Sequence, residues 1–255
     1  MCLACVKRRA FVSLGLAVAA SPARGSDAVE PRFRRSLSTD GRRRVALTLD
    51  ACNGGFDRRI ADALIAHEAR ATIFLTGDWL RANPDGLRLL LAHRALFAFE
   101  NHGAHHVPAV LGGGTLWGLR VAGTLDAVRR EVEQGSLAVA AATGSTPHWY
   151  RGAAARYSPA ALAEIGRLGF GVAAFTLNGD EGASLPAAAV AARVAAARDG
   201  EIVIGHINQP HRASGAGWAQ GIAALARAGV VWCDLDQLRP ELVAQVIPSV
   251  LVSGL

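Results

Sequence analysis

The sequence has few charged residues, few cysteines and no apolar run long enough to cross a bilayer. Only 19% of its 255 residues are charged. Residues 12–20 form a short apolar stretch, whereas a membrane-spanning helix needs about 20 residues, so we expect no stable membrane anchor. No internal repeat or low-complexity tract is present. Hydrophobic residues make up 51% of the chain, which excludes a disordered protein. The length of 255 residues predicts one large domain or two small ones.

The excess positive charge lies at the N-terminal end of the sequence. The chain carries a formal net charge of +6 and a pI near 9.9, values typical of proteins that bind nucleic acid or anionic membranes. Residues 1–25, however, hold four Lys and Arg and no acidic residue, and residues 26–44 hold six Arg against three acidic residues. The remainder has a net charge of −1, so we expect no nucleic-acid partner.

The first 25 residues have the features of an export signal. The basic residues Lys7, Arg8 and Arg9 precede the apolar stretch, and small residues such as Ala19 and Ala23 provide a cleavage zone. The Lys-Arg-Arg-Ala-Phe-Val sequence resembles a bacterial twin-arginine signal. An ordinary amphipathic N-terminal helix is the alternative. We therefore expect an exported protein, periplasmic or secreted, in which residues 26–43 form a basic linker.

Two of the four cysteines belong to this leader, which leaves Cys52 and Cys233 in the folded part. In an oxidising compartment such a pair can form a disulfide. Two free buried thiols are the alternative, and the sequence leaves both open.

From residue 45 onward, short apolar runs alternate with longer segments rich in Ala and Leu. The short runs predict strands at 45–50, 71–76, 97–100, 147–151, 170–176, 201–206 and 230–233. The longer segments predict helices at 57–69, 125–142, 158–168, 187–197 and 218–228, with Asp57 and Ser158 as N-caps. Strand then helix, repeated about seven times, is typical of a parallel α/β fold, either a barrel or an open sheet.

Ionisable residues follow five of the predicted strands, where a parallel α/β fold places its active site. They are Asp50, the pair His102 and His106, Arg151, Asp180 and His206. A spacing of four points two imidazoles the same way on a helical turn, which suits a divalent metal such as zinc. A metal with its water, an aspartate to accept a proton and a histidine to donate one are the parts of metal-assisted hydrolysis.

The order of these motifs resembles the polysaccharide deacetylase family, the NodB homology domain of carbohydrate esterase family 4. The resemblance runs from about residue 44 to 238 and rests on segments 45–50 and 71–77 and on the strand-end residues above. It implies a distorted (β/α) barrel of about seven parallel strands, with a catalytic domain at 44–240 and a C-terminal tail at 241–255. The implied reaction removes N-acetyl groups from an amino-sugar polysaccharide or oligosaccharide, such as peptidoglycan or a chitin-like glycan, and releases acetate.

The resemblance also implies a role for each matching residue. Asp50 would be the catalytic base and a metal ligand, and Arg151 would orient it. His102 and His106 would bind a divalent metal, with zinc expected. His206 would be the catalytic acid, with Asp180 as its partner.

Three positions depart from the family pattern. Residue 51 is Ala where the family commonly has a second, metal-binding Asp, so the metal is left with Asp50, His102, His106 and water or substrate. The usual Ser or Thr after the first metal histidine is Gly103. The Arg-x-Pro-Tyr motif ends in Ala154, which leaves the backbone donor for the oxyanion less rigidly placed. Because the base, both histidines, the arginine and the acid are present, we interpret the chain as a divergent enzyme.

The long non-periodic segment 103–124 carries Trp117, the best candidate for stacking on a sugar, and the other tryptophans are expected to pack in the core. Two alternatives stay open: a non-catalytic carbohydrate-binding relative and an amidohydrolase acting on a non-sugar C–N bond. A thiol hydrolase using Cys52 is disfavoured because no nucleophile elbow surrounds it. The glycine-rich segment 215–221 is interpreted as a helix start, since no strand precedes it.

Overall fold

The computed structural model describes residues 28–238 and 241–245, so the expected export signal lies outside the described residues. Its centre is an eight-stranded sheet with the order β8-β7-β4-β3-β2-β10-β9, and β11 pairs with the first residues of β2. All of these pairs are parallel. The strands are β2 Arg44–Ala51, β3 Ala71–Leu75, β4 Phe97–Asn101, β7 Trp149–Tyr150, β8 Gly171–Val172, β9 Leu177–Asn178, β10 Glu201–His206 and β11 Val231–Cys233. This arrangement confirms the expected distorted barrel of about seven parallel strands.

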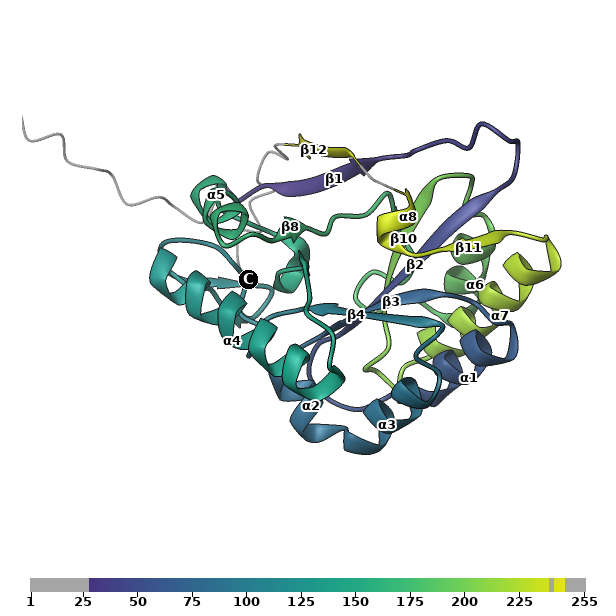
Figure 1. The fold of residues 1–255 in the computed structure, drawn as a ribbon, viewed down its shortest axis with the longest axis horizontal. Helices are drawn as coiled ribbons and strands as arrows, with labels where there is room; N and C mark the ends of the chain where they lie inside the picture. Colours follow the sequence, from purple (N-terminus) through teal and green to yellow (C-terminus); the bar gives the residue numbers. More distant parts are fainter. Residues whose placement is uncertain (1–27, 239–240, 246–255) are drawn as a thin grey trace, which may run out of the picture.

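Helices cover the outer face of the curved sheet (Figure 1). The side chains of β2 alternate, and Val45, Leu47, Leu49 and Ala51 pack with helix residues in the largest apolar cluster. The helices are α1 Arg58–Ala66, α2 Gly77–Ala82, α3 Pro84–Ala92, α4 Leu125–Thr143, α5 Pro159–Arg167, α6 Ala187–Ala195, α7 Ser214–Arg227 and α8 Leu235–Leu238. Among the described residues, none of the helices is long and apolar enough to cross a membrane.

Helix α7 begins four residues before the predicted helix and contains the glycine-rich segment 215–221. A Cβ at Gly217 would lie 2.3 Å from the carbonyl oxygen of Ala187, and one at Gly221 would lie 2.6 Å from Cβ of Val194. The glycines therefore allow α6 and α7 to pack closely, which confirms that this segment starts a helix.

Two expectations about local structure were wrong in detail. The predicted strand at 170–176 is interrupted, because the carbonyl oxygens of Ala173 and Ala174 accept hydrogen bonds from Arg151. Ser158 is the N-cap residue of α5, but its hydroxyl accepts from the backbone N–H of Leu111 and not from its own helix. Asp57 caps α1 as predicted and accepts from the N–H of Arg59.

The segment expected to be a linker contains strand β1, Glu30–Arg34, which pairs antiparallel with β12, Glu241–Gln245, in the expected C-terminal tail. This two-stranded ribbon crosses the side of the molecule opposite the outer helices (Figure 1). The side chain of Phe33 is buried and packs edge-on against Trp149. Arg156 forms an ion pair with Glu30 at 2.8 Å. Residues 30–34 are therefore part of the folded domain.

Candidate active site and metal centre

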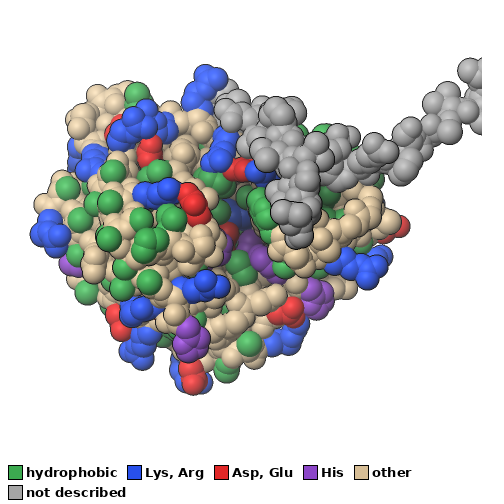
Figure 2. All heavy atoms as spheres, turned by 180° about the vertical axis from the view of Figure 1, so that it is seen from behind, with side chains coloured by type: hydrophobic (Ala, Val, Ile, Leu, Met, Phe, Trp, Pro, Cys, Tyr) green, Lys and Arg blue, Asp and Glu red, His purple; other side chains and the backbone are tan. Residues whose placement is uncertain are grey.

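The sequence-predicted residues converge on one pocket at the carboxyl ends of the parallel strands. The pocket has a volume of about 700 Å³. Figure 2 shows histidine side chains in a hollow of the molecular surface. The lining includes Asp50, Cys52, His106 and His206, together with Trp117 and Ala154. Glu30, Asn178 and Asn208, which we had not predicted, also line it.

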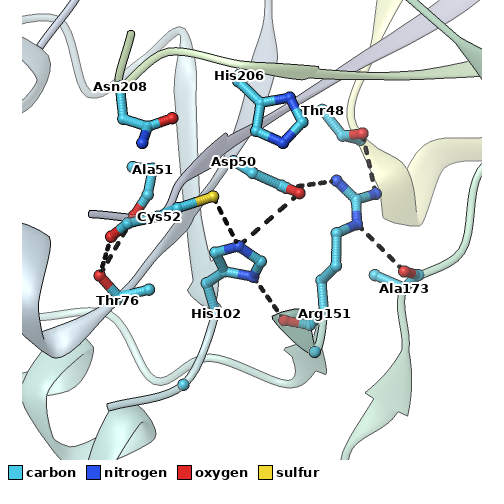
Figure 3. Close-up of polar contacts among 12 residues, drawn as sticks. Thr48, Asp50, Ala51, Cys52, Thr76, His102, Arg151, Ala173, His206 and Asn208 are labelled. Atoms are coloured by element: carbon cyan, nitrogen blue, oxygen red, sulfur yellow. Dashed lines mark hydrogen bonds and ion pairs between the residues drawn. The ribbon is translucent and has the colours of Figure 1, made fainter. Parts of the chain in front are cut away.

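Asp50 is the last residue of β2 whose side chain faces the pocket, and Arg151 binds its carboxylate (Figure 3). Nη1 of Arg151 donates to Oδ1 of Asp50 at 2.8 Å, and Nη2 donates to the hydroxyl of Thr48 at 2.9 Å. The guanidinium also lies 4.2 Å from the ring centre of Phe74, and Arg151 is fully buried. Burial acts to raise the pKa of Asp50, but Arg151 and two nearby imidazoles outweigh it and lower this pKa. Asp50 is thus kept ionised and fixed in orientation.

His206 lies beside Asp50 because the two residues are register partners on β10 and β2. Nδ1 of His206 lies 2.9 Å from Oδ1 of Asp180. Asp180 also accepts from the backbone N–H of His206 at 2.8 Å and from Nε1 of Trp218 at 3.0 Å. Burial acts to lower the pKa of His206, but the carboxylate of Asp180 raises it well above its usual value. The surroundings therefore favour the ionised form of Asp50 and the protonated form of the neighbouring His206.

Cys52, His102 and His106 form a cluster of metal-binding side chains. One donor atom from each residue lies within 4.8 Å of the other two. Sγ of Cys52 lies 3.3 Å from Nε2 of His102, and the two imidazole rings are 4.9 Å apart. Nδ1 of His102 lies 2.6 Å from the carbonyl oxygen of Arg151 and donates to it, which leaves Nε2 with its lone pair toward the cluster.

The charges around this cluster favour a cation. Burial acts to lower the pKa of His102, but Asp50 and Cys52 raise it. Burial acts to raise the pKa of the Cys52 thiol, but the imidazoles of His102 and His106 hold it well below its usual value. A metal ion would satisfy the same negative groups that favour a proton on His102.

The loop that carries His106 is fastened to α4 by the buried carboxylate of Glu131. Oε1 of Glu131 accepts from the backbone N–H of His105 at 2.9 Å and from that of Val107 at 3.0 Å. The preceding Gly103 has a φ of 91°, and a Cβ there would lie 2.3 Å from Oε1 of Glu131. The family's Ser or Thr does not fit here, so the glycine is a consequence of this contact. His102 and His106 are brought together by this loop and not by the helical turn that their spacing suggested.

Replacing Glu131 by Ala should therefore weaken metal binding, although Glu131 is not itself one of the candidate ligands. Each buried N–H left without an acceptor costs about 1–3 kcal/mol, so the loop and His106 lose their fixed position. We expect zinc affinity to fall by about 10- to 100-fold, as for other residues that support metal ligands. Calorimetric titration of the metal-free protein with zinc measures this effect.

The matched variant Glu131→Gln keeps a side-chain oxygen that accepts both hydrogen bonds and should retain most of the affinity. Equal zinc affinity in Glu131→Ala and the wild type would show that Glu131 does not position His106.

Both predicted substrate-binding residues, Ala154 and Trp117, line the pocket. Residues 153–155 form a single turn in which Ala154 has a φ of 64°. The hydroxyl of buried Tyr157 accepts from the backbone N–H of Gly152 at 2.7 Å and supports this turn. Trp117 lies on the hairpin of β5, Thr115–Leu116, and β6, Leu119–Arg120, and is 69% exposed. The guanidinium of Arg156 lies 5.6 Å from the centre of its ring.

The sequence left open whether Cys52 and Cys233 form a disulfide, and in the structure both are free buried thiols. Cys233 pairs with Ala46 at the start of β2, and Cys52 is six residues further along, about 20 Å away, whereas a disulfide needs Cα atoms within about 7 Å. Asp50 as a metal ligand stays a prediction. Its Oδ1 accepts a hydrogen bond from Arg151, and its Oδ2 lies 3.8 Å from Nε2 of His102. Cys52, which was not predicted as a ligand, lies with the two histidines in the cluster.

The curved parallel sheet places these side chains at the carboxyl ends of its strands, where α/β proteins usually carry their functional sites. The polysaccharide deacetylase family model matches residues 38–173, and the chain belongs to this family. No curated protein sequence matches the chain.

Solved structures with the same fold include deacetylases and one pseudoenzyme. The peptidoglycan deacetylase PdaC from Bacillus subtilis has 20% sequence identity and a TM-score of 0.62, over 79% of this chain and 92% of that one. A family 4 carbohydrate esterase from Streptomyces lividans has 20% identity and a TM-score of 0.60, over 76% and 92%. The pseudoenzyme, from Bacillus anthracis, has 21% identity and a TM-score of 0.61, over 78% and 66%. The comparisons thus show the family and the fold. Because these relatives include a pseudoenzyme, activity depends on which catalytic residues this chain retains.

Proposed function

We propose that the protein is a metal-dependent hydrolase that removes N-acetyl groups from an amino-sugar glycan, peptidoglycan or chitin-like, and releases acetate. One observation carries the proposal. Asp50 and His206 are neighbours on adjacent strands, and buried partners hold the first as a carboxylate and the second as an imidazolium. Two titratable groups whose environments push their pKa values apart are the usual form of an acid–base pair.

The Cys52, His102 and His106 side chains fit a divalent metal. They offer three nitrogen and sulfur donors that are close together, and the tautomer of His102 directs its free lone pair to them. When bound, a divalent metal supplies Lewis-acid chemistry, which polarises a carbonyl group and lowers the pKa of a water molecule.

The remaining steps use the protein's own side chains. Asp50, fixed by Arg151, accepts the proton of the water that attacks the acetamide carbon. His206 donates its proton to the leaving amine nitrogen as the C–N bond breaks, which yields acetate and a free amine. Asp180 binds Nδ1 of His206, so the proton is delivered from Nε2. Each positioned proton transfer typically contributes about 100- to 10,000-fold to the rate.

Two residues at the pocket are suited to hold the substrate. The left-handed backbone at Ala154 turns this segment next to the pocket, where a backbone N–H can stabilise the developing oxyanion. The exposed ring of Trp117 offers a flat apolar surface for the face of a sugar ring.

The test is acetate release by the purified protein from a panel of peptidoglycan fragments, chitin oligomers and simple non-sugar acetamides. We expect release from at least one amino-sugar substrate, and only with a divalent metal such as zinc present. Release only from non-sugar amides would favour the amidohydrolase alternative. Binding of a glycan without any release would favour a carbohydrate-binding relative.

We further propose that the protein is exported by the signal in residues 1–25. The support is the basic Lys7-Arg8-Arg9 start followed by an apolar stretch and small residues. Changing Arg8 and Arg9 to Lys should leave the protein inside the cytoplasm of a bacterial host, as measured by fractionation and immunoblotting. Unchanged export of that variant would contradict a twin-arginine signal.

A further inference from the structure

Cys52 follows the end of strand β2 and lines the pocket. The family commonly has a metal-binding aspartate one position earlier, where this chain has Ala51. Strand β2 continues through Ala51, whose side chain is fully buried in the apolar cluster under the helices. Side chains alternate along a strand, so Asp50 and Cys52 point together to the opposite, pocket-facing side. The side chain of Ala51 lies in the apolar layer and cannot bind a metal. Position 52 therefore supplies the side chain that reaches the two histidines.

The backbone around Cys52 is fixed from two sides. The hydroxyl of Thr76 donates to the carbonyl oxygens of Ala51 and Cys52, and the N–H of Thr76 lies 3.3 Å from the first of these (Figure 3). The side-chain amide of Asn208 donates to the carbonyl oxygen of Asn53. The backbone that carries Cys52 is thus held in place before any metal binds, which lowers the entropic cost of binding.

The distance between Cys52 and His102 matches a tetrahedral metal site, and all three donor atoms lie within 4.8 Å of one another. With metal–sulfur bonds of about 2.3 Å and metal–nitrogen bonds of about 2.05 Å, adjacent sulfur and nitrogen donors lie about 3.5 Å apart. Sγ of Cys52 and Nε2 of His102 are 3.3 Å apart. Cys52 is 8% exposed and lines the pocket together with His106, so one side of the cluster faces the pocket. Three protein ligands with one open position are typical of catalytic zinc sites.

We propose that Cys52 is the third protein ligand of the metal, binding through its thiolate sulfur, and that the resulting Cys-His-His site selects zinc over manganese and magnesium. On binding, the thiol proton passes to solvent and a metal–sulfur bond forms. Asp50 then does not bind the metal and acts only as the base. Thiolate and imidazole donors favour zinc, whereas carboxylate-rich sites favour harder ions. The inference deepens the proposed function, because it concerns the metal of that same site.

The competing role for Cys52 is that of a nucleophile. His206 and Cys52 interact, and His206 is held by Asp180, which is the order of groups in a thiol hydrolase. In the structure, however, the sulfur also lies against two imidazoles that have no place in such a triad. Ligand and nucleophile predict different zinc affinities for Cys52→Ala.

The experiment measures metal binding directly on the purified, metal-free full chain. Cobalt(II) is the first probe, because a thiolate–cobalt bond gives a charge-transfer absorption in the near ultraviolet that carboxylate and imidazole ligands do not give. We expect this absorption in the wild type and in Cys233→Ala, which removes the other buried thiol. We expect it to be absent in Cys52→Ala and Cys52→Asp, with circular dichroism verifying that both fold.

Zinc and manganese titrations give the second measurement. Cys52→Ala should lose at least about 100-fold in zinc affinity, the upper end of the loss seen when a merely supporting residue is removed. Cys52→Asp should retain zinc binding and acetate release at a reduced level and gain relative affinity for manganese. Unchanged zinc affinity in Cys52→Ala together with loss of all acetate release would overturn the ligand role in favour of a nucleophile.

The outcomes separate this inference from the proposed function. A wild-type cobalt spectrum without the charge-transfer absorption, or one unchanged in Cys52→Ala, would overturn the ligand role even if acetate is released. A cobalt–thiolate spectrum without acetate release from any substrate would leave the metal site standing and overturn the proposed reaction.

Discussion

Acetate release should fall by about 100- to 10,000-fold when Asp50 is replaced by Asn, because the water that attacks the acetamide then has no base to take its proton. Asn has nearly the same shape and keeps an oxygen for Nη1 of Arg151, which lies 2.8 Å from Oδ1 of Asp50 in the structure. Zinc affinity should change little, since the proposed ligands are Cys52, His102 and His106. A loss in turnover with metal retained is the signature of a missing base.

The variant also leaves the buried guanidinium of Arg151 without its counter-ion, and breaking such a pair typically costs about 3–5 kcal/mol of stability. Thermal unfolding must therefore accompany the rate measurement. The double variant Asp50→Asn with Arg151→Met removes both charges and should recover part of the lost stability without recovering activity. Asp62→Asn, at an exposed position of α1, is the matched control and should behave like the wild type. Recovery of activity in the double variant would contradict the role of Asp50.

Replacing His206 by Ala should reduce acetate release from N-acetylated sugars by a similar factor, because the amine is a poor leaving group unless it is protonated. The loss should be far smaller for an activated aryl acetate, whose leaving group needs no proton. The exposed His211 provides the matched His→Ala control. An equal loss on both substrates would show that His206 acts on structure or binding and not as the acid.

Asp180→Asn tests the same assignment through its pH dependence. The carboxylate of Asp180 raises the pKa of His206 well above its usual value and thereby keeps the acid protonated. Activity should fall on the alkaline side as His206 loses its proton. Removing the carboxylate lowers the pKa of His206, so the alkaline limb of the kcat/KM profile should move to lower pH. A limb that does not move would assign it to another group.

The sequence predicted the central strands because each is a short apolar run that ends at a polar residue. Strand β10 has the predicted bounds, and β2, β3 and β4 differ from prediction by one or two residues. Helices α2 and α3 were not predicted, although Thr76 and Pro84 are recognisable helix-start residues. The pairing of β1 with β12 joins segments about 210 residues apart in sequence, and no local pattern carries such information.

The site was predictable where a residue followed a strand, and less so where side chains meet across the fold. Asp50, His102, Arg151 and His206 were all found from their places at strand ends. Cys52 was predicted only as a disulfide candidate and disfavoured as a nucleophile, because the family's metal-binding residue stands one position earlier, where this chain has Ala51. The period of two along β2, counted from Asp50, would have identified it. Glu131 and Trp218 act through contacts from helices distant in sequence, and nothing in the local pattern marks them.

The central claim is that Asp50 and His206 act with a metal bound beside them to hydrolyse an N-acetyl group. Its most direct test is a time course of acetate and free-amine release from one N-acetylated oligosaccharide, using metal-free protein, zinc-loaded protein and zinc-loaded Asp50→Asn. The account predicts equimolar acetate and amine from the zinc-loaded wild type, and almost none from the other two. Equal release with and without metal, or full activity in Asp50→Asn, would contradict it.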